Sequence, residues 1–155
     1  MSTFVKYLCV LGMSVLPIVE LRGAVPFGVG AMELPLVPVL IVSIIGNMLP
    51  VPFIILFVRK LFEWMKQKSP KLGALAEKLE ERGKKKGEML VKYEALGLFI
   101  LVAIPLPGTG AWTGALVAAM MDLRLKNAIP MIFLGVVTAG IIMAVFSDVF
   151  LVWHG

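Results

Sequence analysis

Two charged residues, Glu20 and Arg22, lie between apolar stretches and are the residues of this sequence best placed to carry chemistry. A charge at the centre of a membrane-inserted helix costs about 2.5–3.5 kcal/mol on insertion scales, so it needs a partner, water or a ligand. A guanidinium matches the shape of a phosphate or carboxylate, so Arg22 is expected to bind an anionic group of a substrate. Glu20 is expected to bind substrate too and to carry a coupling proton. The structural alternative is a Glu20–Arg22 ion pair, which needs a broken backbone because residues two apart diverge on a helix.

A second motif, PLPGTGAWTGAL at 105–116, is uncharged and rich in small residues. Pro107 ends one apolar arm, and Gly108, Thr109 and Gly110 precede the next. The N-terminus of a half-helix carries free N–H groups and partial positive charge, so these four residues are predicted to contact an anionic substrate. The structural alternative is that the GxxxG spacing of Gly110 and Gly114 is a face for helix packing or self-association.

A third motif, GNMLPVPFIILF at 46–57, places Asn47, Pro50 and Pro52 inside an apolar run. Prolines there free backbone carbonyls, and such carbonyls at membrane depth must line a cavity or be buried in protein. Asn47 and Pro52 are therefore predicted substrate contacts. Asn47 has the equally plausible role of an interhelical hydrogen bond.

The sequence lacks the residues for other chemistries. His154 is the single histidine and Cys9 the single cysteine, so we expect no histidine-based metal site, no catalytic triad and no intramolecular disulfide. The glycines at 108–110 are not followed by the Gly-Lys-Ser/Thr of a nucleotide loop. We expect no enzymatic activity, no metal and no cofactor.

The composition is that of an integral membrane protein. Hydrophobic residues make up 59% and charged residues 16% of 155 residues, with a mean hydropathy of +0.95, whereas soluble domains are about a quarter charged. The net charge of +5 does not indicate nucleic acid, because eleven of the fifteen basic residues lie between Arg59 and Lys92. Basic residues beside spans report topology instead.

Four apolar regions, 4–32, 37–58, 95–121 and 129–152, define an all-α fold in a single membrane domain, 1–155. The second and fourth regions have the length of ordinary spans. Glycine and proline interrupt the first at 20–30 and the third at 104–114, leaving arms of about half a bilayer. Each interrupted region is predicted to form a re-entrant hairpin. The fold is then two inverted halves, 1–58 and 94–155, each a hairpin followed by a transmembrane helix.

The segment 59–93 is predicted to be a basic amphipathic helix that joins the halves, although its helical spacing of apolar residues is interrupted by lysines around Gly83 to Gly87. We expect the chain in the plasma membrane of a prokaryotic cell, and the positive charge of this segment predicts that it lies on the cytoplasmic side. Arg124 and Lys126 stay on the same side if 95–121 is a hairpin, whereas a full crossing would export them. The two halves share only a loose echo, RGAVPFGVGAMEL at 22–34 and PGTGAWTGALVAAMMDL at 107–123.

Three motifs, SVLPIVELRGAVPFG at 14–28, IGNMLPVPFIILF at 45–57 and VAIPLPGTGAWTGALVA at 102–118, resemble the prokaryotic putative small multidrug export proteins. That family looks like a short relative of the DedA and VTT-domain proteins, several of which move lipid phosphates. The resemblance implies re-entrant hairpins, a functional acidic residue that Glu20 matches, and a Pro-Gly that Pro107 and Gly108 match. The arginines that follow that Pro-Gly in DedA-type proteins are absent, because Thr109 and Gly110 stand there.

We therefore expect a transporter or flippase of an amphipathic, anionic, lipid-phosphate-like substrate, coupled to protons through Glu20. The alternative is proton-coupled efflux of cationic drugs, with Glu20 as the cation site. A further alternative is a structural or chaperone-like membrane protein. The expected partners are membrane lipids and a second copy of the chain in a homodimer or other homo-oligomer, with no nucleic acid.

Overall fold

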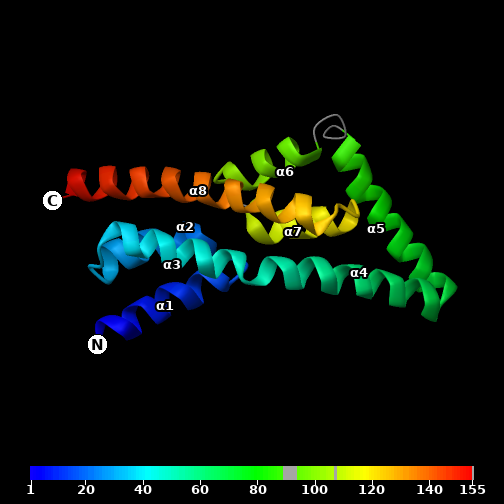
Figure 1. Cartoon of the computed structure of the whole chain (residues 1–155), viewed down its shortest axis with the longest axis horizontal. Coiled ribbons are helices and arrows are strands. Elements are labelled where there is room, and N and C mark those ends of the chain that lie inside the picture. The colour runs from blue at the N-terminus through cyan, green and yellow to red at the C-terminus, as the bar shows by residue number, and fades with distance from the viewer. Residues whose placement is uncertain (89–93, 107, 155) are drawn as a thin grey trace.

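The computed structural model describes residues 1–88, 94–106 and 108–154, and statements on side chains concern 1–82, 95–106 and 108–148. Within these residues the chain is helical and has no strand. The elements are α1 (Thr3–Val15), α2 (Glu20–Pro26), the π-helix η1 (Phe27–Ala31), α3 (Leu36–Met48), α4 (Pro50–Lys68), α5 (Pro70–Glu88), α6 (Glu94–Ala103), α7 (Ala111–Met120) and α8 (Leu125–His154). Figure 1 shows an elongated bundle, with α5 crossing one end.

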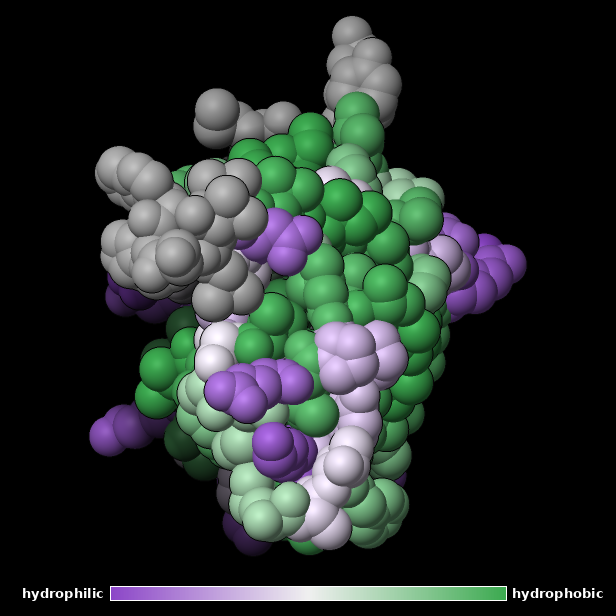
Figure 2. All heavy atoms as spheres, turned by 90° about the vertical axis from the view of Figure 1, so that its left-hand side faces the viewer, coloured by the Kyte–Doolittle hydropathy of each residue, from purple (hydrophilic) through white to green (hydrophobic). Residues whose placement is uncertain are grey.

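Two helical segments in the described part of the chain are long and apolar enough to cross a membrane, Leu36–Lys68 and Leu125–Asp148. Their surfaces expose large apolar side chains, among them Phe53 at 71% and Phe146 at 63%. Figure 2 shows hydrophilic residues scattered over the end where the termini lie, with hydrophobic surface around them. Apolar exposure on this scale indicates a lipid-facing surface. The two predicted spans are confirmed as candidate membrane helices.

The first span is continuous where the sequence predicted a break. Leu49 joins α3 to α4 in helical conformation, and its N–H donates to the Ile45 carbonyl at 3.0 Å. Pro50 occupies the first position of α4, where the missing N–H is harmless. The interruption predicted at Asn47 to Pro52 is thus reduced to a bend between α3 and α4 (Figure 1).

The first interrupted region breaks earlier than predicted. Helix α1 ends at Val15, a turn follows over 16–19, and α2 begins at Glu20. Pro17, which lies in this turn, is the interrupting residue, whereas Gly23 and Pro26 are helical. The expectation that 20–30 is the break is wrong, because the chain stays helical there: α2 ends at Pro26 and the π-helix η1 continues directly from it. In Figure 1, α1 runs toward the middle of the molecule and α2 with η1 runs back.

The second interrupted region breaks where the sequence predicted. Helix α6 ends at Ala103 and α7 begins at Ala111, so the break lies within 104–110. Helices α6 and α7 also run to the middle of the molecule and back, from the opposite end (Figure 1). The two turns, 16–19 and 104–110, which we call the first and second tips, approach each other there.

The linker differs from the single helix predicted over 59–93. Helix α4 continues to Lys68, Ser69 is extended, and α5 begins at Pro70. The α5 backbone stays helical through Gly83 to Glu88, where the apolar spacing is interrupted, and 89–93 lie outside the described residues. Ala76 is fully buried in the main hydrophobic core, which also holds Phe62 of α4. Helix α5 is thus amphipathic, as predicted, and packs on α4.

Corresponding features recur in the two halves. Gly46 of α3 packs on α1, where an added Cβ would meet Leu11 and Ser14. Gly135 of α8 packs in the same way on Phe99 and Val102 of α6. The sequences before α3 and α8, MELPL at 32–36 and MDLRL at 121–125, each have their acidic residue in the left-handed region, with φ of 53° at the first and 54° at the second.

Candidate functional site

Arg22 connects α2 to the second tip. Its Nη1 donates to the Leu106 carbonyl, and its Nη2 donates to the Ile104 carbonyl at 3.1 Å and to Thr109 Oγ1 at 2.8 Å. Thr109 Oγ1 itself lies 2.7 Å from the Ile104 carbonyl. These carbonyls follow the end of α6, which carries partial negative charge. The guanidinium therefore adds charge-assisted hydrogen bonds to two carbonyls that also accept from the Leu106 and Thr109 N–H groups within the tip.

Glu20 contacts the start of α7. The Trp112 N–H donates to a Glu20 carboxylate oxygen at 3.4 Å, and Glu20 is 5% exposed. The Trp112 indole N–H reaches back and donates to the Val15 carbonyl, the last of α1, at 3.0 Å. The N-terminus of α7 carries partial positive charge, which favours a carboxylate beside it. The sequence predicted an anionic ligand at this helix start, and the structure places Glu20 there.

Glu20 and Arg22 do not pair with each other. The ion pairs of the described residues involve other side chains, and both residues lie in the first turn of α2. Each one instead binds a helix end of opposite partial charge in the other half of the chain. Glu20 has a φ of 48°, unusual for a residue with a side chain and a sign of backbone strain held by surrounding contacts. Of the two alternatives from the sequence, the Glu20–Arg22 ion pair is therefore not formed, and the contact with substrate stays a prediction.

The glycines of the second tip have conformational and steric roles. Gly108 has a φ of 78° and Gly110 a φ of 129°, both in the region that favours glycine. A Cβ on Gly110 would overlap the Glu20 carboxylate, whereas one on Gly108 would meet nothing within 4 Å. Gly114 packs against Val102 and Ile132 of the same chain. The face of Gly110 and Gly114 is therefore used for internal packing, and the prediction of a surface for self-association is wrong.

The two tips enclose a cavity of about 260 Å³. Its lining residues come from both tips and from α2 and α7: Pro17, Ile18, Glu20, Arg22, Pro105, Leu106, Gly108, Thr109 and Thr113. Four predicted site residues, Glu20, Arg22, Gly108 and Thr109, meet here, and Gly110 touches Glu20. Pro107 lies outside the described residues. We call this cavity the tip cavity.

Asn47 and Pro52 do not line the tip cavity. Pro52 lies in an apolar groove of about 630 Å³ together with Met48, Phe53 and Pro130. Asn47 is 3% exposed on α3, and its Oδ1 has no hydrogen-bond partner among the described residues. The interhelical hydrogen bond considered for Asn47 is thus not formed by that oxygen.

Sequence reasoning missed the role of Trp112 and of the backbone carbonyls. The missed signal is the position of Trp112, two residues after Gly110, because a residue there supplies one of the free N–H groups at the start of α7. Its indole could be assigned to Val15 only from the three-dimensional structure.

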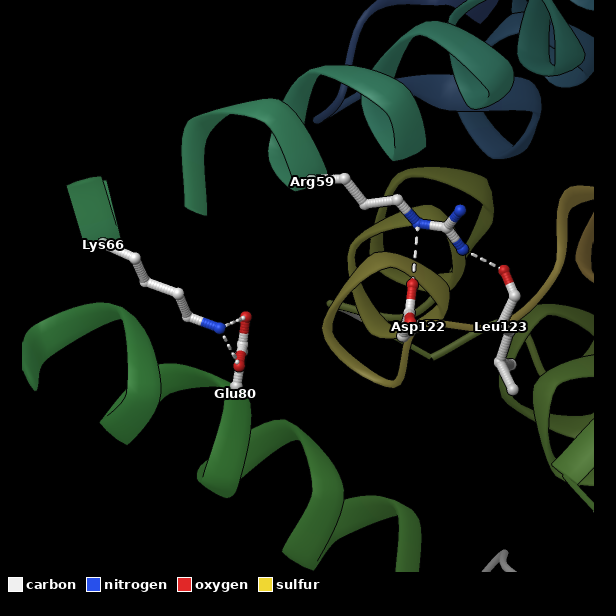
Figure 3. A network of polar contacts seen from close by, with 5 residues as sticks. All are labelled: Arg59, Lys66, Glu80, Asp122 and Leu123. Atoms are coloured by element: carbon white, nitrogen blue, oxygen red, sulfur yellow. Dashed lines mark hydrogen bonds and ion pairs between the residues drawn. The ribbon is translucent and has the colours of Figure 1, made fainter. Parts of the chain in front are cut away.

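A second polar cavity of about 310 Å³ lies between α4, α5 and the turn after α7. Arg59 Nε lies 3.5 Å from Asp122 Oδ1 and its Nη2 donates to the Leu123 carbonyl, while Lys66 Nζ donates to both Glu80 oxygens at 2.8 and 2.9 Å (Figure 3). Figure 3 shows these as separate contacts, the first joining α4 to the α7 turn and the second joining α4 to α5. The basic groups lining this cavity are thus engaged in structural contacts.

Substituting Gly110 tests the contact between the tips. Gly110→Ala is expected to lower the free energy of unfolding by about 1–3 kcal/mol, because alanine is strained at this φ and its Cβ displaces the Glu20 carboxylate. Gly108→Ala is the control, since it carries the backbone strain without the overlap. The measurement is denaturation of the purified protein in detergent. Equal losses for the two variants would show that the Gly110 to Glu20 contact contributes nothing.

A helical chain with two apolar spans and a charged cavity between two helix breaks defines a helical membrane protein, and the comparison with known families agrees. The chain belongs to the family described as putative small multi-drug export protein, which matches residues 20–142. The match begins at Glu20 and includes both candidate spans up to the middle of α8. No curated protein and no solved structure matches the chain.

Proposed function

We propose that this chain is a proton-coupled transporter that exports amphipathic cations, with Glu20 as the carboxylate for which proton and substrate compete. The observation that carries the proposal is the difference between the two charges of the tip cavity. Both terminal nitrogens of Arg22 are bound by acceptors of the second tip, whereas Glu20 has a single hydrogen bond of 3.4 Å. A carboxylate has about four acceptor sites, so Glu20 retains most of its capacity for a ligand.

Competition at one carboxylate sets the direction of coupling. A cation that binds ionised Glu20 displaces a proton, so inward proton movement drives outward movement of substrate. This is exchange, the coupling that export requires when protons are more abundant outside. The family description, with its reference to drug export, is consistent with this direction.

The second candidate is transport of an anionic amphiphile of the lipid-phosphate type. It is favoured by the start of α7, where the Trp112 N–H donates to Glu20, a residue that lines the tip cavity together with Arg22. An anion can bind there only when Glu20 is protonated and leaves the helix start, so anion and proton bind together. Cation and anion transport therefore predict proton movements of opposite sign.

The architecture proposed for this function is a pair of inverted halves with re-entrant hairpins. The arms are short: α1 has 13 residues and α6 and α7 have 10 each, against about 20 for a full crossing. The corresponding packing of Gly46 and Gly135 and the matching backbone before α3 and α8 support the repeat. A distant relationship to DedA-type proteins remains part of the proposal.

The basic linker supports a cytoplasmic location for the α4–α5 end in a prokaryotic plasma membrane. The tip cavity is open at one side, where Ile18 is 94% exposed beside Glu20 and Arg22. Charges at mid-membrane depth require shielding from lipid. We propose a second copy of the chain as that shield, in a homo-oligomer surrounded by membrane lipids.

The sign of proton movement tests the function. Tetraphenylphosphonium, added to the purified protein in weakly buffered detergent, is expected to release protons from the protein. In proteoliposomes, a pH gradient that is acidic on the side where α3 begins and α8 ends is expected to drive transport of this cation. Dihexanoyl phosphatidic acid gives proton uptake if the second candidate is correct. A protein that neither exchanges protons with these probes nor moves them above protein-free liposomes would refute both candidates.

A further inference from the structure

Two buried polar side chains of α3 have unpaired oxygen atoms. Ser43 is fully buried and Asn47 is 3% exposed, and neither Ser43 Oγ nor Asn47 Oδ1 has a hydrogen-bond partner among the described residues. They lie four residues apart, so they share one face of the helix. A buried polar atom without a partner costs about 1–3 kcal/mol, and most such atoms in proteins are paired with ordered water. Two on one face, inside a candidate membrane span, indicate bound water.

This face of α3 lies over the first hairpin. Val39, one turn before Ser43, approaches η1 and α1 where a Cβ on Gly28 would meet both Val39 and Val10. Gly46, next to Asn47, approaches Ser14 of α1. Ser43 and Asn47 therefore face the interior of the bundle, between α1 and α2, and the apolar groove containing Pro52 lies elsewhere.

Helix direction connects this face to Glu20. Helix α3 runs toward the middle of the molecule, while α2 and η1 run away from it (Figure 1). Val39 and Gly28 mark the point of closest approach. Eight residues forward along α3 from Val39 lie at Asn47, and eight residues back from Gly28, through the start of η1 and along α2, lie at Glu20, roughly two helical turns in each case. Ser43 and Asn47 are thus successive steps from the terminal end of the molecule toward Glu20, level with small residues of α2, including Ala24.

We propose that Ser43 and Asn47 bind water and form the route by which a proton travels between Glu20 and the end of the molecule where α3 begins. This inference rests on the proposed role of Glu20 and assigns the proton its own path, distinct from the opening of the tip cavity. In the proposed topology this end faces outward, the side from which exchange draws protons. Neutral hydroxyl and amide groups suit such a path because they orient water and hold no charge.

The charged groups on and beside the three helices around the route lie at its ends. Glu20 and Arg22 are at the inner end. Lys6 of α1, Tyr7 of α1 and Glu33 before α3 are at the outer end, where Lys6 Nζ donates to the Met32 carbonyl at 2.7 Å. Between them the described faces carry Ser14, Ser43 and Asn47 as polar residues, and Ser14 Oγ already donates to the Val10 carbonyl at 2.9 Å.

Cysteine reactivity tests hydration of the route without any transport assay. In a Cys9→Ser background, Ser43→Cys and Asn47→Cys are treated with a small methanethiosulfonate in spheroplasts and in inside-out vesicles. Val136→Cys is the control, because Val136 is 1% exposed on α8 and buried in the apolar core. Both test positions are expected to react about tenfold faster than the control, from the side of the α3 start, because only a hydrated thiolate reacts. Reaction no faster than the control would overturn the proposal.

A second measurement follows the proton itself. Hydrogen–deuterium exchange of the Glu20 carboxyl is recorded by infrared spectroscopy, with Glu20→Gln identifying the band. Ser43→Ala combined with Asn47→Leu is expected to slow this exchange about tenfold while leaving the unfolding midpoint equal or higher, because replacing buried polar groups and their bound water by apolar side chains can be neutral or stabilising. Ser147→Ala, which removes another buried unpaired hydroxyl on α8, is expected to change nothing. Exchange at the wild-type rate in the double variant would refute the route even if Glu20 still exchanges protons for substrate.

Discussion

Glu20→Gln is expected to reduce proton-coupled transport to the level of protein-free liposomes while the protein stays folded. The amide cannot exchange a proton or attract a cation, but its oxygen still accepts the Trp112 N–H that Glu20 binds at 3.4 Å. The variant therefore removes the charge and keeps the contact between the tips. Transport is measured as cation movement driven by a pH gradient, and folding by the denaturation midpoint in detergent.

Glu33→Gln is the matched control for this variant. Glu33 is the other glutamate with a left-handed backbone, φ 53° against 48° for Glu20, and it lies beyond η1, away from the tip cavity. Glu33→Gln therefore makes the same change of side chain at a similar backbone conformation, and we expect this variant to transport at the wild-type rate. If Glu20→Gln transports as well as Glu33→Gln, the carboxylate of Glu20 is not the exchange group and its role is structural.

The chemistry of the site was readable from the sequence because charges inside apolar segments are rare. Glu20 and Arg22 could be identified from the free energy that a charge costs inside a membrane. The PGTG motif could be identified because glycine and proline end helices, whose terminal N–H and C=O groups then need other hydrogen-bond partners. The structure brings these two features together. What the sequence could not supply was the assignment of each charge to a helix end, since that depends on how the two tips meet across the bundle.

The position of the first break shows a limit of pattern reading. Glycine and proline are dense at 20–30, yet this stretch is helical as α2 and η1, and the turn lies at 16–19 with a single proline. Local propensity is a weak guide where packing holds a helix together. Gly28 is tolerated because Val39 and Val10 fill the space that a side chain would need.

Neighbouring residues can also have unrelated surroundings, as α3 and α4 illustrate. Asn47 and Pro52 looked like one interruption in the sequence, but the helix continues through Leu49 and turns them to different surfaces. Asn47 is buried and Pro52 lines an apolar groove. Residues five apart on a helix differ by about 140° in direction, so one motif served two environments.

Arg22→Ala is expected to give the largest loss of stability of any single substitution at the tips. The guanidinium donates to the Ile104 and Leu106 carbonyls and to Thr109 Oγ1, and alanine removes all three hydrogen bonds, which join α2 to the second tip. Hydrogen bonds to charged groups contribute about 1.5–3 kcal/mol each in soluble proteins, and the three act on one side chain, so we expect a total loss of about 3 kcal/mol. Denaturation in detergent measures it.

Two further variants separate this structural role from a role in binding substrate. Arg22→Lys keeps the charge, but an ammonium cannot match the fork of donors that reaches three acceptors at once, so an intermediate loss is expected. Arg124→Ala removes an exposed arginine and is expected to change stability by less than about 0.5 kcal/mol. If Arg22 instead serves an anionic substrate, Arg22→Ala leaves stability near that of Arg124→Ala and abolishes proton uptake with phosphatidic acid. That pair of results would favour an anionic substrate over a cationic one, because the Arg22 guanidinium would then be available to bind an anion.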